Sequence, residues 1–355
     1  MVWGTVIVAG GRRADDLMGL LLAEVHEEVG RPTTFYLRYP VERDADGDLF
    51  PLKEARLAPG AEIAVFQRGS GFNDCLVKGY VFSHQIRLIH GVEGSTVEVI
   101  GGDSTILMDR ETKITQWADN TSDSDAVSSI VGGYGLTPEV ESTNTRHLEN
   151  KRTLIQHDTD LNFIRMLARR NGYLFWVRAD ETLEETAYFK PVQLNAVAEA
   201  PLLTINLDNP NMRAFDITWD VERPTSIIAA AYDGAAKTIM DGSGAPPPST
   251  FAGDVPLNAI ASEVRSTSII AAVADVGDLT GRAAGVLNDT SWFVQATGTV
   301  SAQEVGAVIH AHTLVNVDGV GTRFSGSYFV AAVRHVISSD DHLMTLTLVR
   351  NGWRA

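Results

Sequence analysis

The chain has 355 residues, 44% of them hydrophobic, and a formal net charge of −16. It is long enough for roughly two to four domains, and its acidic balance disfavours nucleic-acid binding, because phosphates attract lysine and arginine. No apolar run is long enough to span a bilayer, Met1–Gly10 lacks the pattern of a secretion signal, and the single Cys75 excludes an intrachain disulfide. We therefore expect a globular protein that is made and assembled in the cytoplasm.

The N-terminal part of the chain is predicted to form strands. Thr5–Val8, Leu20–Val29 and Thr33–Tyr39 have the β-branched and aromatic content of strands. The apolar spacing of Leu17–Val29 also fits a helix, so this element stays open between the two. Cys75 is expected to be a small buried residue in a later strand.

An acidic run follows these strands. Its Asp46-Gly47 pair favours a tight turn between extended segments. Alternating acidic residues also occur in calcium-binding helical loops, but such a loop needs glycine and glutamate where Leu49 and Ala55 stand. We therefore interpret the run as a turn.

Two hairpins far apart in the chain look alike. The first contains Val77, Val81, His84 and Ile86 followed by Thr96–Ile100, and the second contains Val330, Val333, His335 and Ile337 followed by Met344–Leu348. A duplicated barrel-like domain would explain the likeness. Chance similarity between hairpins rich in valine and isoleucine remains an alternative.

A first helix is predicted in the middle of the chain, after a strand closed by Leu107–Arg110. One of the residues Thr121–Ser124 is expected to cap it, since short polar side chains accept hydrogen bonds from free amides. Its apolar face consists of Ala126, Val127, Ile130 and Val131. Gly132, Gly133 and Gly135 then end it.

A second helix follows, capped by Asp158 or Thr159. Leu161, Ile164, Leu167 and Ala168 recur on one face at helical spacing. Arg165, Arg169 and Arg170 lie in its last turns, where cations suit the helix dipole. Gly172 is predicted to end the helix in a left-handed conformation, and Tyr173–Val177 to continue as a strand.

The C-terminal part returns to β-structure. A helix is expected over Thr280–Leu287, capped by Asp278 or Thr280. Before this helix, residues 237–256 are rich in glycine, proline and serine and are predicted to form a mobile loop.

The order of these central elements resembles one family of proteins. It runs strand, Leu-Met-Asp-Arg, capped helix, Tyr-Gly-Leu, variable loop, Gln156 to Asp160, capped helix, Asn-Gly-Tyr and strand. This order is similar to that of the phage late control protein D family, the tail hubs of phages and contractile injection systems, and to the amino-terminal part of valine-glycine-repeat spike proteins. Three further regions extend the resemblance over most of the chain. Pro59–Phe66 with Cys75–Phe82 looks like the family's first barrel, Phe215–Tyr232 looks like the opening strands of its second barrel, and the closing hairpin is similar to its end.

The resemblance implies a mainly β fold with an inserted α+β segment, in which two tube-like β-barrel or sandwich domains in tandem flank a small helical domain. The expected domains are residues 1–110, 111–200 and 201–355. Hubs of this family form a trimeric ring that adapts a six-fold inner tube to a three-fold spike. The implied partners are two further copies of the chain, a trimeric spike, the inner tube protein and baseplate wedge proteins. The spike is expected to be a separate chain, because Ala355 follows directly on the last hairpin. The expected location is the baseplate of a phage-like particle assembled in the bacterial cytoplasm.

Two other functions compete with this interpretation, a baseplate-associated cell-wall hydrolase and a carbohydrate-binding β-sandwich. The first needs a cluster of catalytic side chains, which the sequence does not reveal. The second needs exposed aromatic platforms, whereas the tryptophans lie mostly in apolar surroundings.

No catalytic, cofactor-binding or metal-binding residue is predicted. His310 and His312 alternate on an expected strand and would face the same way, which is compatible with metal ligation, but neither a carboxylate nor a third imidazole lies near them in sequence. We therefore expect ordinary strand histidines there. His157 lies beside Asp158 and Asp160, which helix capping explains better than acid-base catalysis.

Overall fold

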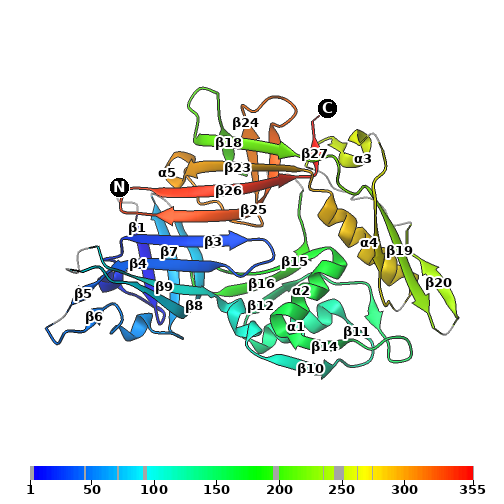
Figure 1. The fold of residues 1–355 in the computed structure, drawn as a ribbon, viewed down its shortest axis with the longest axis horizontal. Helices are drawn as coiled ribbons and strands as arrows, with labels where there is room; N and C mark the ends of the chain where they lie inside the picture. Colours follow the sequence, from blue (N-terminus) through cyan, green and yellow to red (C-terminus); the bar gives the residue numbers. More distant parts are fainter. Residues whose placement is uncertain are drawn as a thin grey trace.

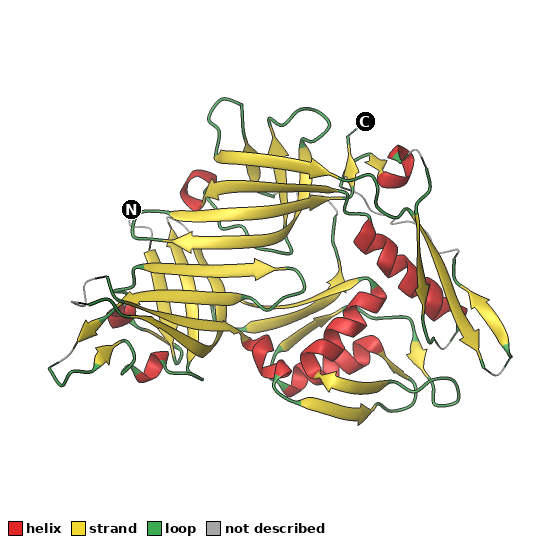
Figure 2. Cartoon of the chain, in the orientation of Figure 1, coloured by secondary structure: helices red, strands yellow, loops and turns green. Residues whose placement is uncertain are grey.

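The fold is mainly β, with helices gathered in the middle of the chain and near the C-terminal strands (Figure 2). The computed structural model describes residues 4–43, 45–69, 72–90, 94–194, 200–234, 236–243, 252–261, 263–273 and 275–354. Most of the long strands join one 13-stranded sheet. Within the described ranges, no helix has the length and apolar character to cross a membrane.

The first half of this sheet is a six-stranded unit, which we call the first unit. Its strands pair in the order β3-β4-β9-β8-β7-β1. Their bounds are β1 Gly4–Ala9, β3 Leu22–Glu28, β4 Thr34–Pro40, β7 Glu62–Gly69, β8 Phe72–Arg87 and β9 Thr96–Asp103. In Figure 1, β1 and β7 are seen at a steep angle to β3 and β4, so the sheet curls. The strand interpretation of Leu20–Val29 is thus confirmed over the helical one.

The other half is the second unit, whose strands pair in the order β18-β23-β26-β25-β24-β17. Their bounds are β17 Leu202–Thr204, β18 Met212–Trp219, β23 Val294–Ser301, β24 Leu314–Asp318, β25 Gly326–Ile337 and β26 His342–Arg350. The two units join where Ala332–Ile337 of β25 pairs antiparallel with Ala23–Glu28 of β3. One apolar core, which includes Val25, Phe35, Val330 and Leu346, runs through both units.

The two units share one topology. If the six strands of each unit are numbered by their order in the chain, both units have the strand order 2-3-6-5-4-1. Each fifth strand also carries a β-bulge where it meets the sixth, after Val81 in β8 and after Val330 in β25. The predicted likeness of the two hairpins is confirmed, since β8–β9 and β25–β26 hold equivalent places. The units differ at the first strand, because β1 pairs antiparallel to β7 and β17 pairs parallel to β24.

A segment with its own core, residues 104–194, lies between the units. It contains β10 Thr112–Gln116, β11 Thr121–Ser122, α1 Asp123–Gly133, β12 Thr137–Val140, β13 Arg146–His147, β14 Ile155–Thr159, α2 Asp160–Asn171, β15 Tyr173–Ala179 and β16 Glu185–Pro191. Both predicted helices are confirmed. Ser122 caps α1 in a capping box with Asp125, and Thr159 caps α2, which ends at the left-handed Gly172.

One prediction about this segment is wrong. Leu107–Arg110 does not close a strand, because β9 ends at Asp103 and residues Ser104–Asp109 form a 3-10 helix, η3. The Asp103 carboxylate starts this helix by accepting a hydrogen bond from the amide of Thr105. Arg170 lies in the last turn of α2, as predicted. It is largely buried and pairs with the buried Asp123 of α1, so it links the two helices.

The second unit carries an insertion between β18 and β23. It contains β19 Ser226–Asp233, β20 Thr238–Asp241, β21 Val255–Pro256, α3 Leu257–Ile260, β22 Ser266–Ile270 and α4 Val276–Thr290. The predicted helix is present but begins earlier, at Val276, and Asp275 caps it. It packs on Ile227, Ala229 and Ala231 of β19, which leaves the large sheet and forms a small sheet with β20 and β22. Phe215–Tyr232 therefore supplies only one strand, β18, to the large sheet.

The remaining elements are short. They are β2 Arg12–Arg13, η1 Asp15–Leu17, β5 Glu42–Arg43, β6 Leu49–Phe50, η2 Ala55–Leu57, α5 Ala302–Val305 and β27 Gly352–Trp353. The turn predicted at Asp46-Gly47 lies between β5 and β6, and Gly47 is left-handed. The predicted mobile loop 237–256 contains β20 and β21, and its residues 244–251 lie outside the described ones.

Candidate functional site

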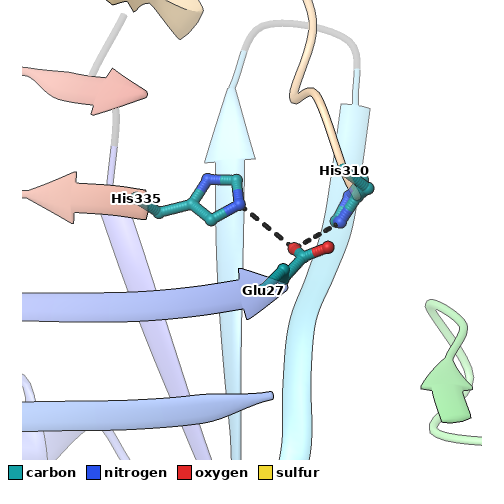
Figure 3. Close-up of side chains that lie close together, drawn as sticks. All are labelled: Glu27, His310 and His335. Atoms are coloured by element: carbon teal, nitrogen blue, oxygen red, sulfur yellow. Dashed lines mark hydrogen bonds and ion pairs between the residues drawn. The ribbon is translucent and has the colours of Figure 1, made fainter. Parts of the chain in front are cut away.

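A buried group of acidic and imidazole side chains lies where the two units meet (Figure 3). Glu27 comes from β3, His335 from β25, and His310 from the segment between α5 and β24. Strand alternation explains two of these positions. Glu27 continues the inward series Ala23 and Val25, and His335 lies between the inward Val333 and Ile337. We call these three residues the junction cluster.

One oxygen of Glu27 lies at the centre of the cluster. Its Oε1 is 2.8 Å from Nδ1 of His310 and 3.1 Å from Nε2 of His335. The other oxygen, Oε2, accepts a hydrogen bond of 2.9 Å from the amide of Ala311. The carboxylate therefore joins a strand of the first unit to two separate segments of the second.

Two further titratable side chains extend the cluster outward. Nδ1 of His335 is 3.0 Å from Nε2 of His342, which is itself buried. Nε2 of His310 is 3.1 Å from Oδ1 of Asp74 on β8, a close ion pair that is poorly aligned for a hydrogen bond. Five side chains thus form a continuous series, from Asp74 to His342.

Charge is unevenly distributed within this series. Burial alone would raise the pKa of Glu27, but the charge of His310 and the hydrogen bonds from both imidazoles hold it well below its usual range. Burial would lower the pKa of His310, but Glu27 and Asp74 raise it to about 9. Burial dominates at His335, whose pKa is lowered, and at His342, where it is lowered to about 3. An anionic glutamate thus faces one cationic and two neutral imidazoles at neutral pH.

A small cavity of about 30 Å³ lies beside the cluster, lined in part by Glu27, His310, Lys78 and Arg178. It has room for a single water-sized molecule. The three lysine and arginine side chains in its wall have carboxylate partners, since Lys78 lies 3.1 Å from Glu185, Arg178 lies 3.3 Å from Asp74 and Arg31 lies 3.2 Å from Glu28. The arrangement can therefore hold a small ion or a water molecule.

The sequence interpretation of His310 and His312 is corrected. They do not alternate on a strand, because β24 begins only at Leu314 and His312 has a positive φ of 66°. Their rings diverge. His310 contacts Glu27, whereas His312 stacks on Trp176 with 4.3 Å between ring centroids. Burial lowers the pKa of His312 to about 4.

The partners of His310 were missed because they are remote in the chain, with Glu27 standing 283 positions earlier. One signal was present in the sequence. A charged residue continues the inward series of Ala23 and Val25, and charge at an inward strand position requires a partner. Two structural predictions are confirmed. Cys75 is buried in β8. The carboxylates of Asp158 and Asp160 accept hydrogen bonds around the start of α2.

Two sheet edges form a second feature of functional interest. Among the described residues, no strand pairs with the outer edge of β18, and none pairs with the second edge of β8 beyond Val81. The equivalent edge of β25 is filled by β3. Partly exposed apolar side chains lie in and just after the last part of β8, namely Phe82, Ile86, Leu88 and Ile89.

Comparison with known proteins begins with a family match. The sequence matches the family of the Alg8 N-terminal domain over residues 2–339. No curated protein matches it.

Several solved structures share the fold. A tail protein of Neisseria meningitidis is 14% identical, with 99% of this chain and 98% of that chain covered and a TM-score of 0.68. The 43 kDa tail protein of prophage MuSo2 from Shewanella oneidensis is 15% identical, with 98% of each chain covered and a TM-score of 0.65. An E. coli component of the type VI secretion system is 13% identical, with 98% of this chain and 79% of that chain covered and a TM-score of 0.61. At these identities the likeness establishes the fold alone.

Proposed function

The chain belongs to the family of the Alg8 N-terminal domain, and from its fold, which it shares with phage tail proteins, we propose that it is a structural hub in the baseplate of a phage tail or phage-like contractile injection system. Three copies form a ring that adapts a six-fold inner tube to a three-fold spike. The observation that carries this proposal is the repeated topology of the two units, together with the edges that each leaves free. We also propose the division into domains 1–110, 111–200 and 201–355.

The contact between the two units supplies the template for the ring. Within one chain, the second strand of the first unit, β3, pairs with the free edge of the fifth strand of the second unit, β25. The strands in the equivalent places are β18, the second strand of the second unit, and β8, the fifth strand of the first unit, and their corresponding edges are free among the described residues. If β18 of one copy pairs with β8 of the next, the same contact recurs between chains.

Such a contact joins unlike surfaces head to tail, and it closes into a ring when the rotation per unit divides a full turn. Three chains with two units each give six similar positions, which match a six-fold tube. Pairing also covers strand edges that would otherwise invite uncontrolled association. Ile86 and Leu88, which are 47% and 62% exposed at the end of β8, would be covered in the same contact.

The remaining partners follow from this role. The ring would bind the inner tube on one side and a separate trimeric spike on the other, with baseplate wedge proteins around it, in a particle assembled in the bacterial cytoplasm. The role is mechanical and not catalytic. The cavity at the junction cluster, at about 30 Å³, is too small for a sugar or peptide substrate.

Light scattering of the purified chain, alone and co-expressed with its spike and tube partners, tests the proposal. A trimer in either condition is expected. A strict monomer in both would overturn the ring.

A pair of double variants locates the contact. Replacing Ile86 and Leu88 with Asp should yield a folded monomer, because charge at the end of β8 opposes burial between copies. The matched control replaces Ile114 and Ile155, which are exposed on β10 and β14 of the central segment, and should stay trimeric. Loss of the trimer in both variants, or in neither, would contradict the assignment of the contact to β8.

A further inference from the structure

We propose that Glu27, His310 and His335 bind one divalent transition-metal ion of the zinc type, which fastens the first unit to the second. Each residue offers one ligand atom, and these atoms all lie within 4.8 Å of one another. All three side chains are buried. The proposal concerns the interior of a single chain and does not depend on the ring.

The donor set suits such an ion. Two imidazoles and one carboxylate are a recurrent ligand combination for zinc and for neighbouring divalent metals. Around a tetrahedral zinc ion with bonds of about 2.0–2.1 Å, two ligand atoms lie about 3.3 Å apart. The observed separations of 2.8 Å and 3.1 Å from the Glu27 oxygen are slightly shorter than this value, and the two imidazole nitrogens lie within 4.8 Å of each other, so the side chains would adjust to bring all three atoms to this spacing.

Each proposed ligand is also held in place by a partner at its other polar atom. Asp74 lies against Nε2 of His310 and leaves Nδ1 for the metal. His342 lies against Nδ1 of His335 and leaves Nε2 for the metal. The amide of Ala311 holds the second oxygen of Glu27. Partners of this kind orient metal ligands in proteins, and losing one typically costs about 10–100-fold in affinity.

The space beside the cluster indicates the kind of site. A cavity of about 30 Å³ can hold one water molecule as a fourth ligand but no substrate. The ligands come from β3 of the first unit and, in the second unit, from β25 and the segment between α5 and β24. The ion would therefore act as a structural link across the β3–β25 contact.

Protons alone can occupy the same network, but they require a different tautomer. Without a metal, Nε2–H of His342 donates to Nδ1 of His335, whose Nε2–H donates to Glu27. With a metal on Nε2 of His335, the proton of that ring lies on Nδ1 and is donated to His342. The two states are therefore distinguishable by the nitrogen chemical shifts of the imidazoles.

The test is a calorimetric titration of the full chain with Zn²⁺ after treatment with a chelator. We expect one ion per chain for the wild type. Glu27→Gln, which keeps an acceptor for Ala311 but loses the anionic ligand, should bind more than about 100-fold more weakly, and Asp74→Asn about 10–100-fold more weakly. Glu24→Gln and His26→Gln are matched controls on the same strand, since both residues point away from the cluster, and they should bind as the wild type does.

A second measurement uses the wild type alone, in case Glu27→Gln does not fold. Co²⁺ added to the metal-free chain should give the intense visible absorption of a four-coordinate site, and the tautomer of His335 should change as described. The proposal is overturned if the folded wild type binds neither ion stoichiometrically, or if Co²⁺ gives only the pale six-coordinate spectrum. Equal Zn²⁺ affinity of the wild type and folded Glu27→Gln would also overturn it. A trimeric chain that fails this test would leave the hub proposal intact.

Discussion

The sixth strand of each unit ends at a buried charged residue, and the two residues have opposite charges. In the first unit, β9 ends at Asp103, which accepts hydrogen bonds from the amides of Thr33 and Thr105 at 2.6 Å and 3.0 Å. In the second, β26 ends at Arg350, whose guanidinium donates to the carbonyls of Ala252, Phe324 and Ser325. One topology thus accommodates either charge.

The difference follows from the backbone groups that each end must satisfy. Free amides require an acceptor, and free carbonyls require a donor, when both are buried. In the first unit these groups belong to the start of β4 and of η3, and in the second to loops around residues 252 and 324. The strand order is the same in both units, whereas the loops around each strand end set its charge.

Removing Arg350 should break the second unit. We expect Arg350→Met to lower the free energy of unfolding by about 4 kcal/mol, because three carbonyls lose a charged donor and are left buried. Urea denaturation measures this change. Arg334→Met is the control, since Arg334 makes a half-exposed ion pair with Glu24 and should cost less than about 1 kcal/mol. Equal losses in the two variants would show that burial of Arg350 has no special role.

The two units also differ in how closely the backbone packs around one of their glycines. A Cβ on Gly79 of β8 would lie 1.9 Å from the carbonyl oxygen of Gly102, so backbone must move, and Gly79→Ala should cost about 3 kcal/mol or more. A Cβ on Gly298 of β23 would meet the flexible Met212 at 3.0 Å, and Gly298→Ala should cost about 1 kcal/mol. Thermal and urea unfolding of both variants test the ranking. A larger loss for Gly298→Ala would contradict the packing described for the first unit.

The pH dependence of stability should distinguish the two charges. Burial raises the pKa of Asp103 to about 6, against hydrogen bonds from Thr105 and Thr33 that lower it. Because the folded chain then holds a proton that the unfolded chain releases, the stability from Asp103 is full below about pH 3.8 and is lost as pH rises through 6. The wild type should thus lose up to about 3 kcal/mol relative to Asp103→Asn between pH 4 and pH 7.

Urea titrations of both chains across this range measure that difference. Arg350→Met serves as the comparison. It retains Asp103, and an arginine stays charged over this interval, so the difference in stability between the wild type and Arg350→Met should stay constant. A constant difference between the wild type and Asp103→Asn would refute the raised pKa of Asp103.

The sequence was most informative where structure depends on neighbouring residues. Caps at Ser122 and Thr159, the left-handed Gly172 and the turn at Gly47 were predictable, because each depends on hydrogen bonds or backbone freedom within a few residues. The η3 helix was missed because Leu107–Arg110 was assigned to the end of a strand, whereas β9 ends at Asp103 and the side chain of Asp103 starts the helix.

The junction cluster could not be predicted in the same way. Glu27 and His310 stand 283 positions apart, and only the pairing of β3 with β25 brings them together. The sequence therefore determined the local elements, the repeated hairpins and the inward position of Glu27, all of which follow from periodicity and short-range hydrogen bonding. The tertiary structure alone decided which strand edges are filled, which remain free and which buried charges meet, because these depend on how distant strands share one sheet.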